Sequence, residues 1–111
     1  MSVVKKIGVP ALLEQTAEEC CELAHACLKM ARKLRDENPT PRQIEDIRDD
    51  LAEEMADVAV CLNMIKWHTD ITSSREQSLL ENQKEHRWYD RLDIHMDFEK
   101  EEELDDVVYS D

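Results

Sequence analysis

Glycine and proline are scarce in this chain. Among 111 residues there is one glycine, Gly8, and there are three prolines. So few residues that interrupt helices argue against a β-rich fold and favour a small number of long helices. A Walker A loop and the glycine-rich turn of dinucleotide-binding proteins each need several glycines, so this sequence contains neither. Any phosphate binding must therefore come from a metal ion and from basic side chains.

Basic residues and long apolar runs are also lacking. The chain has 14 lysines and arginines against 27 aspartates and glutamates, which gives a formal net charge of −13. Proteins that bind the nucleic-acid backbone need a basic face, so we expect no nucleic-acid polymer as a partner. Because there is neither a run of 18 apolar residues nor the apolar core of a signal peptide, we expect no membrane association and a cytoplasmic location.

The four cysteines form no C-x-x-C pair. They are Cys20, Cys21, Cys27 and Cys61, and all lie within helical patterns. We expect them to be small, buried, reduced thiols, with zinc binding as the alternative.

What the chain does contain is apolar residues at helical spacing. One series predicts a helix from about Pro10 to Arg35 and consists of Leu13, Ala17, Cys20, Ala24, Cys27, Ala31 and Leu34. A second series predicts a helix from about Pro41 to His68 and consists of Ile44, Ile47, Leu51, Met55, Val58, Leu62 and Ile65. We expect both series to face the core.

A turn separates these two helices. The segment D-E-N-P-T-P at 36–41 predicts it, and we expect Thr40 to cap the second helix with Pro41 in its first position. Two long helices folded back on each other, with a thin third, cannot cover their own apolar series. We therefore expect a homodimer or tetramer to bury the remainder.

A third helix is predicted from Ser73 to about Leu92, because Ser73 begins an S-x-x-E capping box. Its apolar face is thin, and the segment that follows it, 93–111, is strongly acidic. We predict one all-α domain over 1–111 with its helical core at about 10–92. This domain is an antiparallel bundle of three to four helices per chain, completed by homo-oligomerisation.

Two acidic motifs are arranged symmetrically about the turn. Glu19 pairs with Glu22, and Glu54 pairs with Asp57, each three residues apart and so on one face of a helix. Both pairings across the turn have their midpoint at position 38, so an antiparallel hairpin brings all four carboxylates to the same height. Carboxylates gathered beside an apolar seam repel one another unless a cation neutralises them. Oxygen ligands suit magnesium or manganese, so we predict that these four residues form a metal site.

These motifs also resemble those of a known family. E-E-x-x-E-L at Glu18–Leu23 and E-E-x-x-D-V at Glu53–Val58 resemble the MazG-like all-alpha nucleoside triphosphate pyrophosphohydrolases, whose relatives include dimeric dUTPases and phosphoribosyl-ATP pyrophosphohydrolase. The resemblance covers about 15–91. The gap from Glu22 to Glu54 is slightly longer than is usual there, which we interpret as longer helices.

The resemblance implies a function and roles for individual residues. The expected reaction is magnesium-dependent hydrolysis of an NTP or dNTP to the monophosphate and pyrophosphate, in nucleotide pool sanitation or precursor control. Glu53 or Glu18 would orient or deprotonate the attacking water. The predicted phosphate-binding residues are Lys84, Arg87, Arg91 and Lys29. The predicted base- or sugar-binding residues are Gln15, Asn63 and Trp67, with Trp88 as a second residue that could stack on a base.

Two other interpretations are open at this point. Glu22 and His25 match one E-x-x-H ligand motif of the di-iron carboxylate bundles, but the second acidic motif has Asp57 where a histidine is required. The net charge also fits a non-enzymatic acidic interaction protein that mimics nucleic acid toward a basic partner. That interpretation predicts acids spread over outer helix faces, whereas the four predicted ligands border the apolar series.

Overall fold

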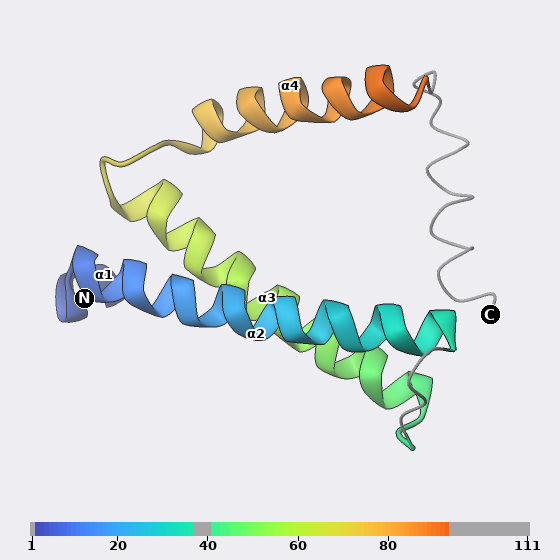
Figure 1. Ribbon diagram of the computed structural model, residues 1–111. Coiled ribbons are helices and arrows are strands. Elements are labelled where there is room, and N and C mark those ends of the chain that lie inside the picture. Colours follow the sequence, from blue (N-terminus) through green and yellow to red (C-terminus); the bar gives the residue numbers. More distant parts are fainter. Residues whose placement is uncertain (1, 37–40, 94–111) are drawn as a thin grey trace. The chain divides into compact units, whose positions relative to one another are not determined.

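The protein is all-helical over the part that the computed structural model describes, which is residues 2–36 and 41–93. Figure 1 shows its four helices, which are α1 (Val3–Ile7), α2 (Val9–Arg35), α3 (Ile44–His68) and α4 (Ser74–Leu92). This confirms the predicted all-α class. The chain divides into two compact units, with the boundary between Ser74 and Arg75. No helix in the described ranges combines the length and the apolar character that crossing a membrane requires.

A short helix, α1, precedes the first long helix. The predicted helical core at 10–92 did not include α1. Ser2 caps it, because its hydroxyl accepts a hydrogen bond from the N–H of Lys5 at 3.1 Å. Gly8 then separates α1 from α2 with a φ of 88°, and its N–H donates to the carbonyl of Val4 at 2.8 Å. A residue with a Cβ would be strained at this φ, so the single glycine stands where the backbone requires it.

The ends of α2 agree with the prediction. Pro10 lies in the first turn, where its missing N–H removes no helical hydrogen bond. At the other end Asp36 is left-handed with a φ of 56°, and its N–H donates to the carbonyls of Arg32 and Lys33. The remainder of the predicted turn, 37–40, lies outside the described residues.

The start of α3 differs from the prediction. Ile44 is its first residue, preceded by Gln43, which has an extended backbone and whose carbonyl accepts the first hydrogen bonds of the helix. Pro41 therefore lies before the helix and not in its first position. The predicted cap, Thr40, lies outside the described residues.

The two long helices pack against each other as an antiparallel hairpin (Figure 1), but the seam on α2 is not the predicted one. Buried and half-buried residues recur along α2 at Leu12, Thr16, Glu19, Leu23, Ala26 and Met30. Leu12 is 2% exposed, whereas Leu13, which begins the predicted series, is 42% exposed. The predicted series lies one residue later, about 100° around the helix. The hairpin therefore leaves that side of α2 largely uncovered.

On α3 the predicted series is right at some positions and wrong at two. Ile47 and Val58 are buried as expected. Met55 and Leu62 are 57% and 44% exposed, because the seam runs through the residues just before them, Glu54 and Cys61. Glu54 thus lies in the seam, where the apolar pattern predicted Met55.

The cysteines are a second correction. Cys61 is buried in the seam as expected, whereas Cys20, Cys21 and Cys27 are free and exposed. The reason is again the orientation of α2, since its thiols lie on the side that α3 does not cover.

The second unit contains α4 from its second residue onward; this helix begins at Ser74, one residue after the predicted cap Ser73, and ends at Leu92 as predicted. None of its residues is buried, and Trp88 is 68% exposed. Asp93 follows with a left-handed φ of 53°, and the rest of the acidic segment, 94–111, lies outside the described residues.

Candidate functional site

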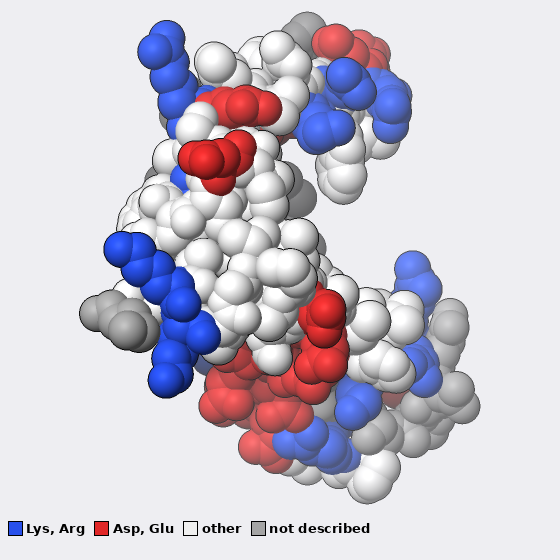
Figure 2. Space-filling view, turned by 90° about the vertical axis from the view of Figure 1, so that its left-hand side faces the viewer, with Lys and Arg blue, Asp and Glu red and all other residues white. Residues whose placement is uncertain are grey.

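Three of the four predicted metal ligands come together in the α2–α3 hairpin. One carboxylate oxygen each from Glu19, Glu22 and Glu54 lies within 4.8 Å of the others. Glu19 and Glu54 are half-buried in the seam, and Glu22 is exposed beside it. On the face drawn in Figure 2, the largest group of acidic side chains lies in the lower part, with lysine and arginine side chains beside it and further acidic side chains elsewhere. We call Glu19, Glu22 and Glu54 the carboxylate cluster.

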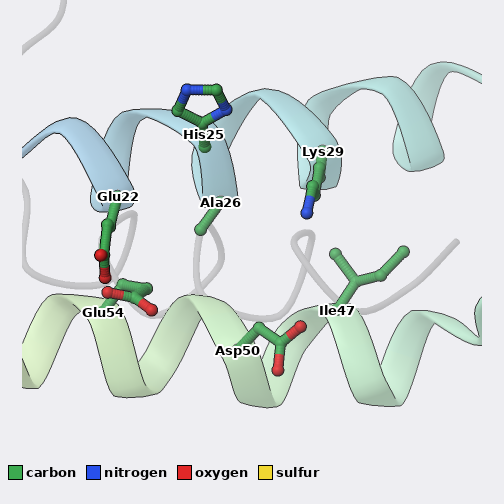
Figure 3. Close-up of a pocket in the computed structure, with 7 residues that line it drawn as sticks. All are labelled: Glu22, His25, Ala26, Lys29, Ile47, Asp50 and Glu54. Carbon is green, nitrogen blue, oxygen red and sulfur yellow. The ribbon is translucent and has the colours of Figure 1, made fainter.

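The register of the hairpin is the one that the symmetric motifs predicted. In Figure 3 the carboxylates of Glu22 on α2 and Glu54 on α3 point toward each other. Further along, Lys29 and Ile47 face each other across the same gap. Both pairs have their midpoint at position 38, as an antiparallel hairpin with its turn there requires.

Asp57 is the predicted ligand that the cluster leaves out. It is exposed, although its negative charge still contributes to the raised pKa of Glu54. Glu18 and Glu53, the predicted catalytic residues, are also exposed. Each directly precedes a cluster member in the sequence, so its side chain leaves the helix about 100° away.

The cluster is electrostatically unfavourable without a cation. Partial burial in the seam raises the pKa of Glu54, and the charge of Glu22 and a proton shared with its carboxylate raise it further. Within the described chain, Oε2 of Glu19 and Oε2 of Glu54 are shut off from solvent and accept no hydrogen bond. Buried polar atoms are normally paired, so these two oxygens need an explanation.

A hard divalent cation fits this donor set. All three donors are carboxylate oxygens, which magnesium and manganese prefer. The three donor atoms lie within 4.8 Å of one another, and they would have to move closer together to share one ion, because Mg–O distances are about 2.0–2.1 Å. His25 is not part of the cluster, and its ring points away from α3 (Figure 3). Among the described residues, the group of three carboxylates therefore includes no histidine of the kind that a di-iron E-x-x-H motif supplies.

Gln15 supports the cluster from one turn away. Its Nε2 donates a hydrogen bond of 2.8 Å to Oε1 of Glu19, which leaves the buried Oε2 as that residue's unpaired oxygen. Hydrogen bonds of this kind orient metal-binding carboxylates in other proteins. The base- or sugar-binding role of Gln15 stays a prediction, and the contact seen in the structure is its hydrogen bond to a predicted ligand.

A pocket of about 470 Å³ adjoins the cluster, a volume in the range of small-molecule sites. It is lined by Glu22, His25, Ala26, Lys29, Ile47, Asp50 and Glu54. Its apolar part comes from Ala26 and the buried Ile47, and the side chain of Lys29 extends from α2 toward α3 (Figure 3). The predicted phosphate-binding residue Lys29 and two cluster members thus border one cavity.

Asp50 is the pocket residue that sequence reasoning missed as a functional candidate. It is half-buried and forms an ion pair with Arg42. The hydrogen bond to Asp50 raises the pKa of Arg42. Its spacing of four residues before Glu54 places it on the same side of α3, and this signal was available in the sequence.

Asn63 and Trp67, which lie in the same unit as this pocket, do not line it. Asn63 is half-buried and Trp67 is 66% exposed, and both lie more than two turns beyond Glu54 along α3. The predicted phosphate-binding residues on α4, in the second unit, are all exposed. They are Lys84, Arg87 and Arg91.

Comparisons with known proteins found no family model, no curated protein and no solved structure that matches this chain. The assignment of a function therefore rests on the chemistry of the site and on the two acidic motifs.

Proposed function

We propose that this protein is a magnesium-dependent nucleoside triphosphate pyrophosphohydrolase, which converts an NTP or dNTP to the monophosphate and pyrophosphate. One observation carries the proposal. Glu19, Glu22 and Glu54 converge from two helices, and two of them hold a buried oxygen with no hydrogen-bond donor among the described residues. The resemblance of the two acidic motifs to the MazG-like superfamily supports the same reaction.

The cluster would hold the metal. Bound magnesium stabilises charge on phosphate oxygens and lowers the pKa of a water molecule. Glu54 contributes most to the need for a cation, because its ionised form is disfavoured by partial burial and by the neighbouring carboxylates. Gln15 keeps Glu19 turned so that its free oxygen belongs to the cluster.

Lys29 would bind the phosphate chain. It lies seven residues after Glu22 on α2, which is about 10 Å along the helix axis. A ligand that reaches both the cluster and this ammonium group must be extended and anionic, as a triphosphate is. The ammonium group can donate to phosphate oxygens and offset their charge. Asp50 in the same pocket is partly neutralised by Arg42, which reduces its repulsion of an anion.

The proton acceptor would be Glu53 or Glu18, which stand next to cluster members and face solvent. An exposed carboxylate can exchange its proton with bulk water after each turnover. The assignments of Lys84, Arg87 and Arg91 to the phosphates, and of Asn63 and Trp67 to the nucleoside, stay predictions that alanine variants can test one at a time.

The test is a panel of common and modified ribo- and deoxyribonucleoside triphosphates, each incubated with magnesium or with a chelator. Release of pyrophosphate is the measurement. We expect hydrolysis of at least one nucleotide only with the metal. Glu54→Gln, which removes a ligand charge at nearly constant volume, should lower that rate by more than about 100-fold. Glu45→Gln is the matched control, because Glu45 is exposed on the same helix and lies outside the pocket.

The outcome can contradict the proposal in two ways. If every triphosphate stays intact at high enzyme concentration, the protein is not this enzyme. If hydrolysis occurs and Glu54→Gln matches Glu45→Gln, the reaction takes place elsewhere.

A non-enzymatic acidic interaction protein is the second candidate. The net charge of −13 and the exposure of Glu18, Glu22 and Asp57 favour it. It predicts no hydrolysis, tight binding to a basic protein without magnesium, and loss of that binding as salt rises. If Glu54→Gln binds the basic protein as strongly as the native chain does, that binding does not depend on the carboxylate cluster.

A further inference from the structure

The side of α2 that α3 leaves uncovered carries an apolar series whose residue types read the same from both ends. It consists of Leu13, Ala17, Cys20, Ala24, Cys27, Ala31 and Leu34, spaced alternately by four and three residues. The residues from Leu13 to Cys27 in this series are exposed, and the last two are half-buried. Alternation of this kind is typical of a helix that packs lengthwise against another helix. Small residues in the middle allow the two backbones to approach closely.

We propose that this surface, which we call the outer face of α2, binds the outer face of α2 in a second copy of the chain. The two helices run antiparallel about a twofold axis near Ala24. In this register Leu13 lies opposite the partner's Leu34, and Cys20 lies opposite the partner's Cys27. A twofold interface requires a surface that is complementary to itself, and a palindromic series meets that condition.

Charges beside the series support the same register. The series one residue later along the helix consists of Glu14, Glu18, Cys21, His25, Leu28, Arg32 and Arg35, all exposed. Its first two members are acidic and its last two are basic. Antiparallel pairing about Ala24 therefore brings Glu14 to the partner's Arg35 and Glu18 to the partner's Arg32. Parallel pairing would place like charges together, which disfavours it.

The middle of that second series, where the two helices cross the axis, consists of Cys21 and Leu28 with His25 between them. Leu28 is 57% exposed and falls opposite the partner's Cys21. The charged contacts thus lie at the two ends of the apolar outer face, as at protein interfaces with a dry centre and a polar rim. A copy of the same helix matches both series when it is read in the reverse direction.

The outer face and the pocket lie on opposite sides of α2. With 100° per residue, Glu22 and Lys29 leave the helix about 140–160° from Ala24. Two copies joined in this way leave the side of the pocket formed by Glu22 and Lys29 open, whereas His25, which also lines the pocket, lies beside the axis. Glu18, one of the two candidate proton acceptors, would lie at this interface, so the following tests measure association directly and do not depend on hydrolysis.

Thiol cross-linking tests the register. In a Cys21→Ser, Cys61→Ser background, Cys20 and Cys27 are the remaining thiols. Oxidation by molecular oxygen with a copper–phenanthroline catalyst should give a covalent dimer on a non-reducing gel. Within one helix these two thiols are about 10 Å apart along the axis, too far for a disulfide. Chains that keep Cys20 alone or Cys27 alone should give no covalent dimer, and an equal mixture of the two should give the disulfide-linked heterodimer.

If the Cys20-only chain by itself gives a covalent dimer, and mixing it with the Cys27-only chain adds no further cross-linking, the helices pair in parallel and the proposed register is wrong. Failure of every combination to cross-link would overturn the interface.

Light scattering tests the association itself. We expect twice the chain mass of 13.0 kDa for the native protein at tens of micromolar, and the single chain mass for Ala24→Glu, which sets two carboxylates against each other at the axis. Ala56→Glu is the control: it makes the same change at an exposed position of α3 and should leave the dimer intact. Circular dichroism checks that both variants keep their helices.

Charge reversal gives a rescue. Glu14→Arg should weaken the dimer at least tenfold, and adding Arg35→Glu should restore it. A monomeric native protein would overturn the proposal and indicate that another part of the chain covers the outer face. A dimer that Ala24→Glu leaves unchanged would place the interface elsewhere.

Discussion

The position of the α2–α3 seam decides where the cluster carboxylates lie, and truncation of two aliphatic side chains on α3 tests it. Ile47→Ala and Leu62→Ala remove the same three carbons, and the apolar pattern predicted that both residues are core. In the structure Ile47 is 3% exposed and Leu62 is 44% exposed. The two variants should therefore differ strongly in stability.

The expected size follows from burial. Three buried carbons at about 0.8 kcal/mol each give roughly 2.4 kcal/mol for Ile47. The cavity that is left raises the cost of truncating a buried isoleucine to about 2–5 kcal/mol. For Leu62 about half of the side chain is already in water, so the loss is about 1 kcal/mol, and the better helix propensity of alanine reduces it slightly. We expect the free energies of unfolding to differ by about 2 kcal/mol or more.

The measurement is urea unfolding followed by circular dichroism at 222 nm. The midpoint should fall much further for Ile47→Ala than for Leu62→Ala, with unchanged slopes. The reactivity of the buried thiol of Cys61 gives a local second readout, because this thiol lies in the seam. Equal destabilisation by the two variants would refute the reasoning. It would mean that α3 buries the side predicted from periodicity, and that Glu54 is not in the seam.

The cluster and the pocket give three further predictions. Because the pKa of Glu54 is raised above its usual 4.5 in the folded state, the folded chain keeps this proton to higher pH than the unfolded chain. Without metal, the free energy of unfolding should therefore fall as pH rises from 4.5 through the raised pKa, and it should fall less in Glu54→Gln. Urea titrations in the presence of a chelator measure this, and the same pH dependence in both proteins would contradict the prediction. Gln15→Ala should weaken manganese binding about 10–100-fold by calorimetry with the helices intact, and an unchanged affinity would exclude an orienting role. Lys29→Gln should raise KM for the triphosphate about tenfold or more while metal affinity stays constant, with Lys5→Gln as control; an unchanged KM would remove Lys29 from the phosphate site.

The candidate site was predictable because its signal is a spacing. Glu19 and Glu22, like Glu54 and Asp57, are three residues apart, and a helix places such residues on one face whatever it packs against. The midpoint at position 38 predicted the register, and Figure 3 shows Glu22 facing Glu54 accordingly. The separation of Asp57 from the other three was not predictable, because it depends on how α3 is rotated about its axis against α2.

The pocket was harder to predict than the cluster. Lys29 was expected near the phosphates from its place on the stripe of Glu22, and it does line the cavity. Asp50 was not expected as a functional residue, although it shares a face with Glu54. Its ion pair with Arg42 joins the segment before α3 to the second turn of that helix. A contact with a residue outside the helix leaves no periodic trace in the sequence.

The amino-acid sequence by itself determined the all-α class, the limits of α2 and α4 to within one residue, and the pairing of the acidic motifs. These depend on local properties: scarce glycine and proline, turn residues, and the three- and four-residue periods of a helix. Only the tertiary structure decided which side of α2 meets α3. Leu12 and Leu13 each begin a series with the same spacing, and one is 2% exposed while the other is 42% exposed. The choice between them depends on how the bulkier side chains fit against α3, and periodicity carries no information about that fit.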